Sequence, residues 1–198
     1  MDVVIASHNL HKIREFREML KKFRSFEVLS LLNFPEFQAL PEVGKTFQDN
    51  ATEKAIHAAK TLNMWALADD SGLVVPALMG APGVQSRRYS GEEASDAENR
   101  RTLLHAMEGM EGLQRTAYFE CCLVLASPQG VKKVVTGTCY GAILREERGR
   151  NGFGYDSVFV KDEYDKTFGE IDEATKNRIS HRRKAIEKLS STLEMLLP

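Results

Sequence analysis

The sequence predicts a single α/β domain over residues 1–198, in which helices flank a central mixed β-sheet. Short apolar runs are followed by segments in which apolar residues recur at helical spacing, and this interleaving is typical of α/β proteins. Two long strand-like segments flank a turn sequence at residues 127–130, which favours an antiparallel hairpin. A length of 198 residues is enough to bury one substantial core.

The first half of the chain begins with an apolar run at residues 3–6, as expected of a strand buried on both faces. A polar turn at residues 7–9 ends it, and the helical spacing of apolar residues then predicts a helix over 10–23. Residues 26–45 are expected to be irregular. Thr46 and Asp49 resemble a capping box for a helix that runs to residue 62. Residues 65–68 predict a second buried strand, ended by a turn at 69–72.

The second half continues with a loop rich in glycine and proline at residues 80–91. Ser95 and Glu98 form a capping box before a helix that runs to about residue 107. The hairpin strands are expected at 115–126 and 131–140. A glycine-rich loop at 151–156 precedes a strand at 157–160, and Ser180 caps a final helix whose apolar face continues to residue 196.

Composition excludes several classes of protein. The formal net charge is −1, with 42% hydrophobic and 28% charged residues, so no global field favours nucleic acid or an anionic membrane. The N-terminal apolar run is too short for a signal peptide, and no apolar stretch approaches the roughly 20 residues of a membrane helix. The three cysteines are interpreted as reduced buried thiols. A cytoplasmic location is therefore expected.

The first polar turn is a candidate phosphate site. Ser7, His8 and Asn9 lie between a buried strand and a helix start, where free N–H groups and the helix dipole favour anions. Lys12 adds a positive charge in the first helical turn. The glycines of a Walker P-loop are missing. The alternative is a simple helix cap with a solvated lysine.

Two adjacent carboxylates, Asp69 and Asp70, follow the second buried strand. Ligands of open α/β sheets bind at the carboxyl ends of strands. Successive side chains point to opposite sides, so one acid can face a cleft while the other supports the turn. Mg²⁺ in proteins takes one or two carboxylates together with phosphate oxygens. The alternative is a solvated turn in which Gly72 supplies a positive φ.

The glycine-rich loop contains Phe153, Gly154, Tyr155 and Asp156. Its aromatic rings can stack on a nucleobase, and Asp156 can accept from an N–H edge or a ribose hydroxyl. The alternative is a strand-entry turn with two core aromatics.

A basic group surrounds the predicted start of the last helix: Lys176, His181, Arg182 and Arg183. Cations there oppose the helix dipole, so an anion or a carbonyl-rich ligand among them is the simplest explanation. The alternative is a solvated basic face.

Together these motifs resemble the inosine triphosphate pyrophosphatase family, which removes non-canonical purine nucleotides, and its bacterial members most. The resemblance extends from residue 3 to about 193 and rests on motifs in family order: residues 7–12, 42–51, 68–73, 81–84, 88–91, 152–156 and 179–182. It implies an elongated two-lobed fold with a central mixed sheet, a nucleotide cleft between the lobes, and a homodimer.

The resemblance also implies roles for individual residues. Asp70 would be the proton acceptor and a magnesium ligand, with Glu42 as the second acidic ligand and Glu36 as an alternative to it. Triphosphate and nucleotide contacts would come from Ser7, His8, Asn9, Leu10, His11, Lys12, Lys54, Ser71, Phe153, Gly154, Tyr155, Asp156, Lys176, His181 and Arg182. His181 and Arg182 would face the 6-oxo edge of the base.

The expected reaction is hydrolysis of ITP, dITP or XTP to the monophosphate and pyrophosphate, with Mg²⁺ as cofactor. One alternative is a Maf-like pyrophosphatase that acts on pyrimidine or modified nucleotides. Another is a nucleotide-binding or RNA-binding module without catalysis, although the clustered acids favour turnover and the near-neutral charge disfavours nucleic acid.

Overall fold

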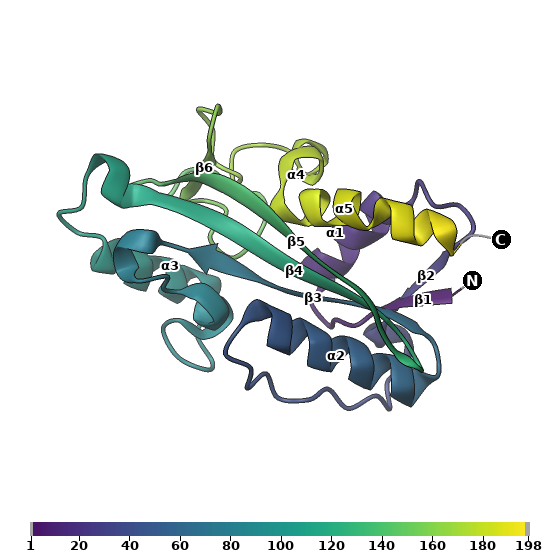
Figure 1. Ribbon diagram of the computed structural model, residues 1–198. Coiled ribbons are helices and arrows are strands. Elements are labelled where there is room, and N and C mark those ends of the chain that lie inside the picture. The colour runs from purple at the N-terminus through teal and green to yellow at the C-terminus, as the bar shows by residue number, and fades with distance from the viewer. Residues whose placement is uncertain (1, 197–198) are drawn as a thin grey trace. The chain divides into compact units, whose positions relative to one another are not determined.

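The computed structural model describes residues 2–196 and contains one six-stranded sheet with the order β2-β1-β3-β4-β5-β6 (Figure 1). The strands are β1 (Asp2–Ile5), β2 (Glu27–Ser30), β3 (Trp65–Val74), β4 (Thr116–Ser127), β5 (Gly130–Ile143) and β6 (Phe159–Lys161). β1 pairs in parallel with both β2 and β3, whereas β6 is antiparallel to β5. The predicted mixed sheet is thus confirmed.

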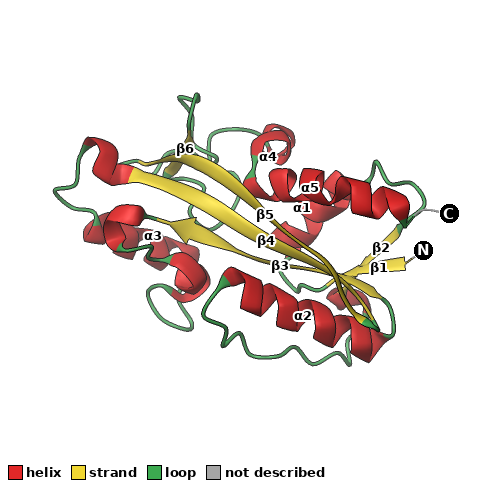
Figure 2. Cartoon of the chain, viewed as in Figure 1, coloured by secondary structure: helices red, strands yellow, loops and turns green. Residues whose placement is uncertain are grey.

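Five α-helices accompany the strands within the described residues (Figure 2). They are α1 (Leu10–Leu20), α2 (Phe47–Leu62), α3 (Asp96–Ala106), α4 (Glu173–Ile179) and α5 (His181–Met195). The capping boxes predicted for α2 and α3 are present: the Thr46 hydroxyl accepts from the Asp49 N–H, and the Ser95 hydroxyl accepts from the Glu98 N–H. These caps satisfy helix-end donors that have no partner inside the helix.

The chain folds into two compact units, each built from non-contiguous segments. Unit 1 contains residues 1–70, 121–137 and 182–198, and unit 2 contains residues 71–120 and 138–181. Strands β3, β4 and β5 each supply residues to both units. The predicted single domain and its nucleotide cleft stay predictions.

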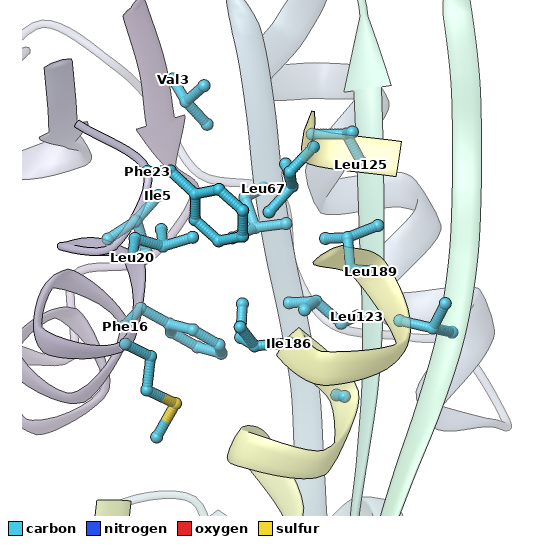
Figure 3. Packing of buried hydrophobic residues seen from close by; sticks show 14 of the residues in the cluster. Val3, Ile5, Phe16, Leu20, Phe23, Leu67, Leu123, Leu125, Ile186 and Leu189 are labelled. Atoms are coloured by element: carbon cyan, nitrogen blue, oxygen red, sulfur yellow. The ribbon is translucent and has the colours of Figure 1, made fainter. Parts of the chain in front are cut away.

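Unit 1 has a core between the sheet and helices α1 and α5. Phe16 and Leu20 of α1 pack with Ile186 and Leu189 of α5 and with Leu123 of β4 (Figure 3). Helix α2 lies on the other side of the strands, and the residues it buries include a row of small alanines (Figure 1). The sheet of unit 1 is therefore covered on both faces, which explains why its strands read as continuous apolar runs.

Unit 2 has its own aromatic core. The ring centroids of Phe119, Phe159 and Phe168 are 4.8–6.1 Å apart. Leu103 of α3 and Met107, which caps the end of α3, belong to the same cluster. Contacts between aromatic rings stabilise a fold beyond the contribution from burial of their apolar surface. This core supports the glycine-rich loop, whose Tyr155 belongs to the same cluster.

Two expectations about the elements are wrong, and one helix was not predicted. The strand predicted to end at residue 68 continues to Val74, so Asp69 and Asp70 lie inside β3 and not in a turn. Residues 27–30, expected to be irregular, form β2, and residues 173–179 form the unpredicted α4. Both missed elements are short, and periodicity needs more residues than they offer.

Among residues 2–196, no helix has the length and apolar character that crossing a membrane requires.

Candidate active site

The two adjacent acids of β3 point to opposite faces of the sheet, because side chains alternate along a strand. Asp69 contacts Lys12 of α1 and Arg182 of α5, whereas Asp70 contacts Asn50 and Lys54 of α2. The helices lie accordingly, with α1 and α5 on one side of the strands and α2 on the other (Figure 1). The two carboxylates thus belong to separate polar clusters of unit 1.

The first cluster, the Asp69 network, consists of Lys12, Glu15, Asp69 and Arg182. Lys12 Nζ lies 3.1 Å from Asp69 Oδ1, and Arg182 Nε lies 3.5 Å from Asp69 Oδ2. Arg182 Nη1 also donates to Glu15 Oε2 at 2.9 Å. The Asp69, Glu15 and Arg182 side chains are at most 5% exposed. The expectation that one of the two acids supports a turn is wrong, because Asp69 is a buried ion-pair partner within a strand.

The second cluster, the Asp70 cluster, consists of Glu42, Asn50, Lys54 and Asp70. Lys54 Nζ lies 2.7 Å from Glu42 Oε1 and 3.2 Å from Asp70 Oδ1. Asn50 Nδ2 donates to Asp70 Oδ2 at 3.0 Å, and its own Oδ1 accepts from the Gly44 N–H at 2.7 Å. One ammonium group therefore lies where two carboxylates converge.

Burial shapes the protonation of the Asp70 cluster. Removal from water raises the pKa of the Asp70 carboxyl, although Lys54 and Lys12 partly oppose this rise. Burial on its own lowers the pKa of Lys54, but the carboxylates of Asp70 and Glu42 outweigh it, so this pKa is raised. Asp70 is thus a carboxylate whose affinity for a proton exceeds that of a solvated aspartate, as a general base requires.

The choice between Glu42 and Glu36 has a geometric basis. Glu42 lies in the Asp70 cluster through Lys54, whereas Glu36 is exposed. Within residues 2–196, no set of three or more acidic, histidine or cysteine side chains is arranged to hold a metal. The two carboxylates of the Asp70 cluster, Glu42 and Asp70, would suit Mg²⁺, because that ion takes its remaining ligands from phosphate and water.

The N-terminal turn of the candidate phosphate site is built as a helix cap. Asn9 Oδ1 accepts from the N–H groups of His11 and Lys12, and the Ser7 hydroxyl accepts from the Asn9 N–H. His8, Leu10 and His11 are exposed, which leaves this turn open to a ligand. Phosphate binding here stays a prediction.

The glycine-rich loop at residues 152–156 is held by a buried ion pair of unit 2. Lys176 Nζ lies 2.6 Å from Asp156 Oδ2, and the same oxygen accepts from the Phe153 N–H at 2.9 Å. The Lys176 ammonium also lies 4.6 Å from the centroid of the Phe153 ring. The structure therefore brings Phe153, Asp156 and Lys176 together, as their predicted common role requires.

His181 lies in the aromatic core of unit 2. Its imidazole stacks on Phe119 with a centroid distance of 4.8 Å and an interplanar angle of 14°, and it is 2% exposed. Ser71, at the start of unit 2, is half-buried. Nucleotide contact by either residue stays a prediction.

Comparison with known proteins assigns the chain to a family. The family model described as Ham1 matches residues 3–192. The chain belongs to the Ham1 family. It is 60% identical to the dITP/XTP pyrophosphatase of Protochlamydia amoebophila, with 99% of each chain covered, and 48% identical to that of Chlamydia abortus, with 100% of this chain and 96% of the relative covered.

Solved structures of Ham1 proteins share the fold. The Staphylococcus aureus Ham1 protein matches with a TM-score of 0.87 at 40% identity, covering 98% of this chain and 99% of its own. A HAM1 protein from Coxiella burnetii matches with a TM-score of 0.89 at the same identity and coverage. The family resemblance drawn from the ordered motifs is confirmed.

Sequence reasoning missed several residues of this chain that hold these clusters. Glu15 and Asn50 are buried polar residues on helices, and each binds a predicted site residue from a distant part of the chain. Asp96 and Arg100 bind the glycine-rich loop from α3. Of these residues, only Asn50 could have been identified from the sequence, because it lies inside one of the family motifs.

Proposed function

We propose that this chain hydrolyses non-canonical purine nucleoside triphosphates, dITP and XTP together with ITP, to the monophosphate and pyrophosphate. The observation that carries the proposal is the Asp70 cluster, in which two carboxylates and one ammonium group converge at a strand inside a Ham1 fold. The relatives from Protochlamydia amoebophila and Chlamydia abortus are named dITP/XTP pyrophosphatase, at 60% and 48% identity over nearly the full chain.

Asp70 acts as the proton acceptor in this proposal. A water molecule attacks the α-phosphorus, the bond from that phosphorus to the bridging oxygen breaks, and pyrophosphate leaves with that oxygen and the bonding electrons. The proton of the water passes to the Asp70 carboxylate, whose pKa is raised by burial. Asn50 fixes the orientation of this carboxylate through its 3.0 Å hydrogen bond.

Two lysines supply positive charge for the triphosphate. Lys12 and Lys54 each bind a carboxylate in the absence of substrate, at 3.1 Å and 3.2 Å from Asp69 and Asp70. Their side chains are 16% and 18% exposed, so each ammonium retains access to an incoming phosphate. The positive end of the α1 dipole adds to this charge at the turn that precedes the helix.

Glu42 and Asp70 would hold the magnesium ion, since both present oxygen to one cationic position that Lys54 occupies. Bound there with the substrate phosphates, Mg²⁺ would neutralise charge that develops on the leaving group. Holding the metal ion is the only role that this proposal gives to Glu42.

In this proposal the base contacts the glycine-rich loop and Lys176 of unit 2. Phe153 stacks on the purine, and Asp156 and Lys176 present polar atoms beside that ring. His181 and Arg182 donate toward the 6-oxo group, so an adenine amino group would leave these donors unpaired. This difference supports selection of inosine and xanthine over adenine.

A pyrophosphate-release screen tests the proposal. The purified chain is incubated with ITP, dITP, XTP, GTP, ATP, dTTP and UTP, with Mg²⁺ or with chelator, and pyrophosphate and orthophosphate are measured separately. We expect pyrophosphate from the first three substrates in Mg²⁺ and a large loss with chelator. Release of orthophosphate only, or preference for dTTP or UTP, would contradict the proposal.

Assembly and location follow as further proposals. We expect a homodimer, to be measured by light scattering coupled to gel filtration at several protein concentrations. A cytoplasmic location is proposed because the substrates belong to the nucleotide pool, and fractionation of cells that express the tagged chain would test it.

A further inference from the structure

Helix α3 binds both backbone polar groups of one residue in the glycine-rich loop, Gly154. Asp96 Oδ2 accepts from the Gly154 N–H at 2.7 Å, and Arg100 Nη1 donates to the Gly154 carbonyl oxygen at 2.8 Å. Asp96 and Arg100 are four residues apart and therefore lie on the same face of the helix, one turn from each other. An acid and a base on adjacent turns thus fix the N–H and C=O groups of a single glycine.

Asp96 and Arg100 together are called the clamp here, and Arg100 is itself held in place by Glu147. Arg100 Nε lies 2.8 Å from Glu147 Oε2, and the same oxygen accepts from the Ser157 hydroxyl at 3.0 Å. Ser157 follows the loop directly in the chain. Glu147 therefore links Arg100 to the residue that follows the loop. Arg100 makes two fixed contacts, with Glu147 and with the Gly154 carbonyl, and only 17% of its side chain is exposed.

The loop needs such a clamp because its own backbone is permissive. Gly152 and Gly154 both have positive φ, at 76° and 60°, and flank Phe153. Glycine populates these conformations at little cost but also many others, so two glycines around an aromatic residue do not fix its ring. Around Gly154 an added Cβ would meet nothing within 4 Å, so the loop is not held there by packing.

The position of the Phe153 ring depends on both of its neighbours. On one side the Asp156 carboxylate accepts from the Phe153 N–H at 2.9 Å. On the other side, Asp96 binds the N–H group of the peptide that joins Phe153 to Gly154, and Arg100 binds the carbonyl of the following peptide. The ring that stacks on the base in the proposed function is therefore anchored from α4 through Lys176 and Asp156, and from α3 through the clamp.

We propose that Asp96 and Arg100 are positioning residues for purine recognition. They act through the N–H and carbonyl groups of Gly154 to place Phe153 against the base. This inference rests on the proposed function, since it assigns the clamp to the base end of the nucleotide. Loss of the clamp weakens binding of the base and leaves the binding of phosphate groups unchanged.

The test compares three variants of α3 in the full-length chain. Asp96→Ala removes the acceptor for the Gly154 N–H, whereas Asp96→Asn retains an acceptor oxygen. Glu98→Ala is the matched control: Glu98 Oε2 accepts from the Ser95 N–H and hydroxyl at 2.8 and 2.7 Å, so its loss weakens the same helix start without touching the loop. The readouts are kcat and KM for ITP, and the inhibition constant of inorganic pyrophosphate, which lacks a base.

We expect Asp96→Ala to raise KM for ITP roughly tenfold, since a charge-assisted hydrogen bond is lost, with kcat within about threefold. The pyrophosphate inhibition constant should not change, Asp96→Asn should recover most of the affinity, and Glu98→Ala should match wild type in KM. Equal rises in KM for Asp96→Ala and Glu98→Ala would overturn the inference, because a weakened helix would then explain both.

Arg100→Met serves if Asp96→Ala fails to fold, because it removes the donor to the Gly154 carbonyl and keeps an apolar stem of similar length. A folded Arg100→Met chain with wild-type KM for ITP overturns the inference. If the wild-type chain itself releases no pyrophosphate from ITP, the proposed function fails, and this outcome is distinct from a clamp without effect in an active enzyme.

Discussion

The buried ion pair between Glu15 and Arg182 makes a sharp prediction about stability. Their side chains are 5% and 4% exposed and are joined by a hydrogen bond of 2.9 Å. Glu15→Ala removes one carboxylate that contacts the buried guanidinium, and Asp69 stays beside it. Breaking a buried pair in this way typically costs about 3–5 kcal/mol, because a buried charge loses its compensation.

Urea unfolding followed by circular dichroism measures this loss. For a chain of this size the dependence of the unfolding free energy on urea is about 2–3 kcal/mol per molar, so the midpoint should fall by roughly 1–2 M. Glu187→Ala is the control, because its partner Arg183 is exposed at 30% and Glu187 at 53%. That exposed pair should contribute about 1 kcal/mol or less.

A double variant separates lost pairing from lost packing. Replacing both Glu15 and Arg182 by methionine removes both charges and keeps much of the buried volume, so it should unfold at higher urea than Glu15→Ala. The reasoning is refuted if Glu15→Ala shifts the midpoint no more than Glu187→Ala. In that case the Asp69 network would not depend on the charge of Glu15.

Two further predictions concern the core and the glycine-rich loop. Burial raises the pKa of the Cys121 thiol, so the folded state holds this proton more tightly than the unfolded chain, and stability falls as pH rises above roughly 8.5. Unfolding titrations at pH 7 to 10 should show a shallower fall for Cys121→Ala, and parallel curves would contradict the assignment. A Cβ on Gly152 would lie 2.0 Å from Asp156 Oδ2, whereas one on Gly154 has open space, and both glycines have positive φ. Gly152→Ala should therefore raise KM for ITP well beyond the effect of Gly154→Ala, and equal effects would show that backbone strain alone matters.

Much of the fold follows from patterns that the sequence displays locally. The apolar run of β1, the helical spacing in α1 and the capping boxes of α2 and α3 each predicted an element that the structure contains. These signals need only neighbouring residues, because they reflect side-chain periodicity and the free N–H groups at helix starts.

The interior of β3 shows where such reasoning fails. Asp69 and Asp70 were expected to end the strand, since carboxylates are rare in buried strands. The strand continues because Lys12 and Arg182 compensate one acid, and Lys54 and Asn50 compensate the other. Those partners come from three helices that are distant in the sequence, so no local pattern reveals them.

The residues of the candidate site likewise fall into those that the sequence indicated and those that only the structure revealed. The motifs identified Asp70, Lys54 and Lys176 by type and order, but not the residues that hold them. Asn50 and the clamp of Asp96 and Arg100 act through hydrogen bonds between elements, and such bonds depend on packing that the sequence alone does not specify. The sequence therefore indicated candidate site residues by type, whereas the residues that contact them were found only from the structure.

The central claim is that Asp70 accepts the proton of the attacking water, and one measurement tests it most directly. Pyrophosphate release from ITP in saturating Mg²⁺ is compared for wild type, Asp70→Asn and Glu53→Gln, in which Glu53 is an exposed acid next to Lys54 on α2. We predict that Asp70→Asn stays folded and loses roughly 10²–10⁴-fold in kcat, while Glu53→Gln matches wild type. A folded Asp70→Asn chain that releases pyrophosphate at a near wild-type rate would contradict the account.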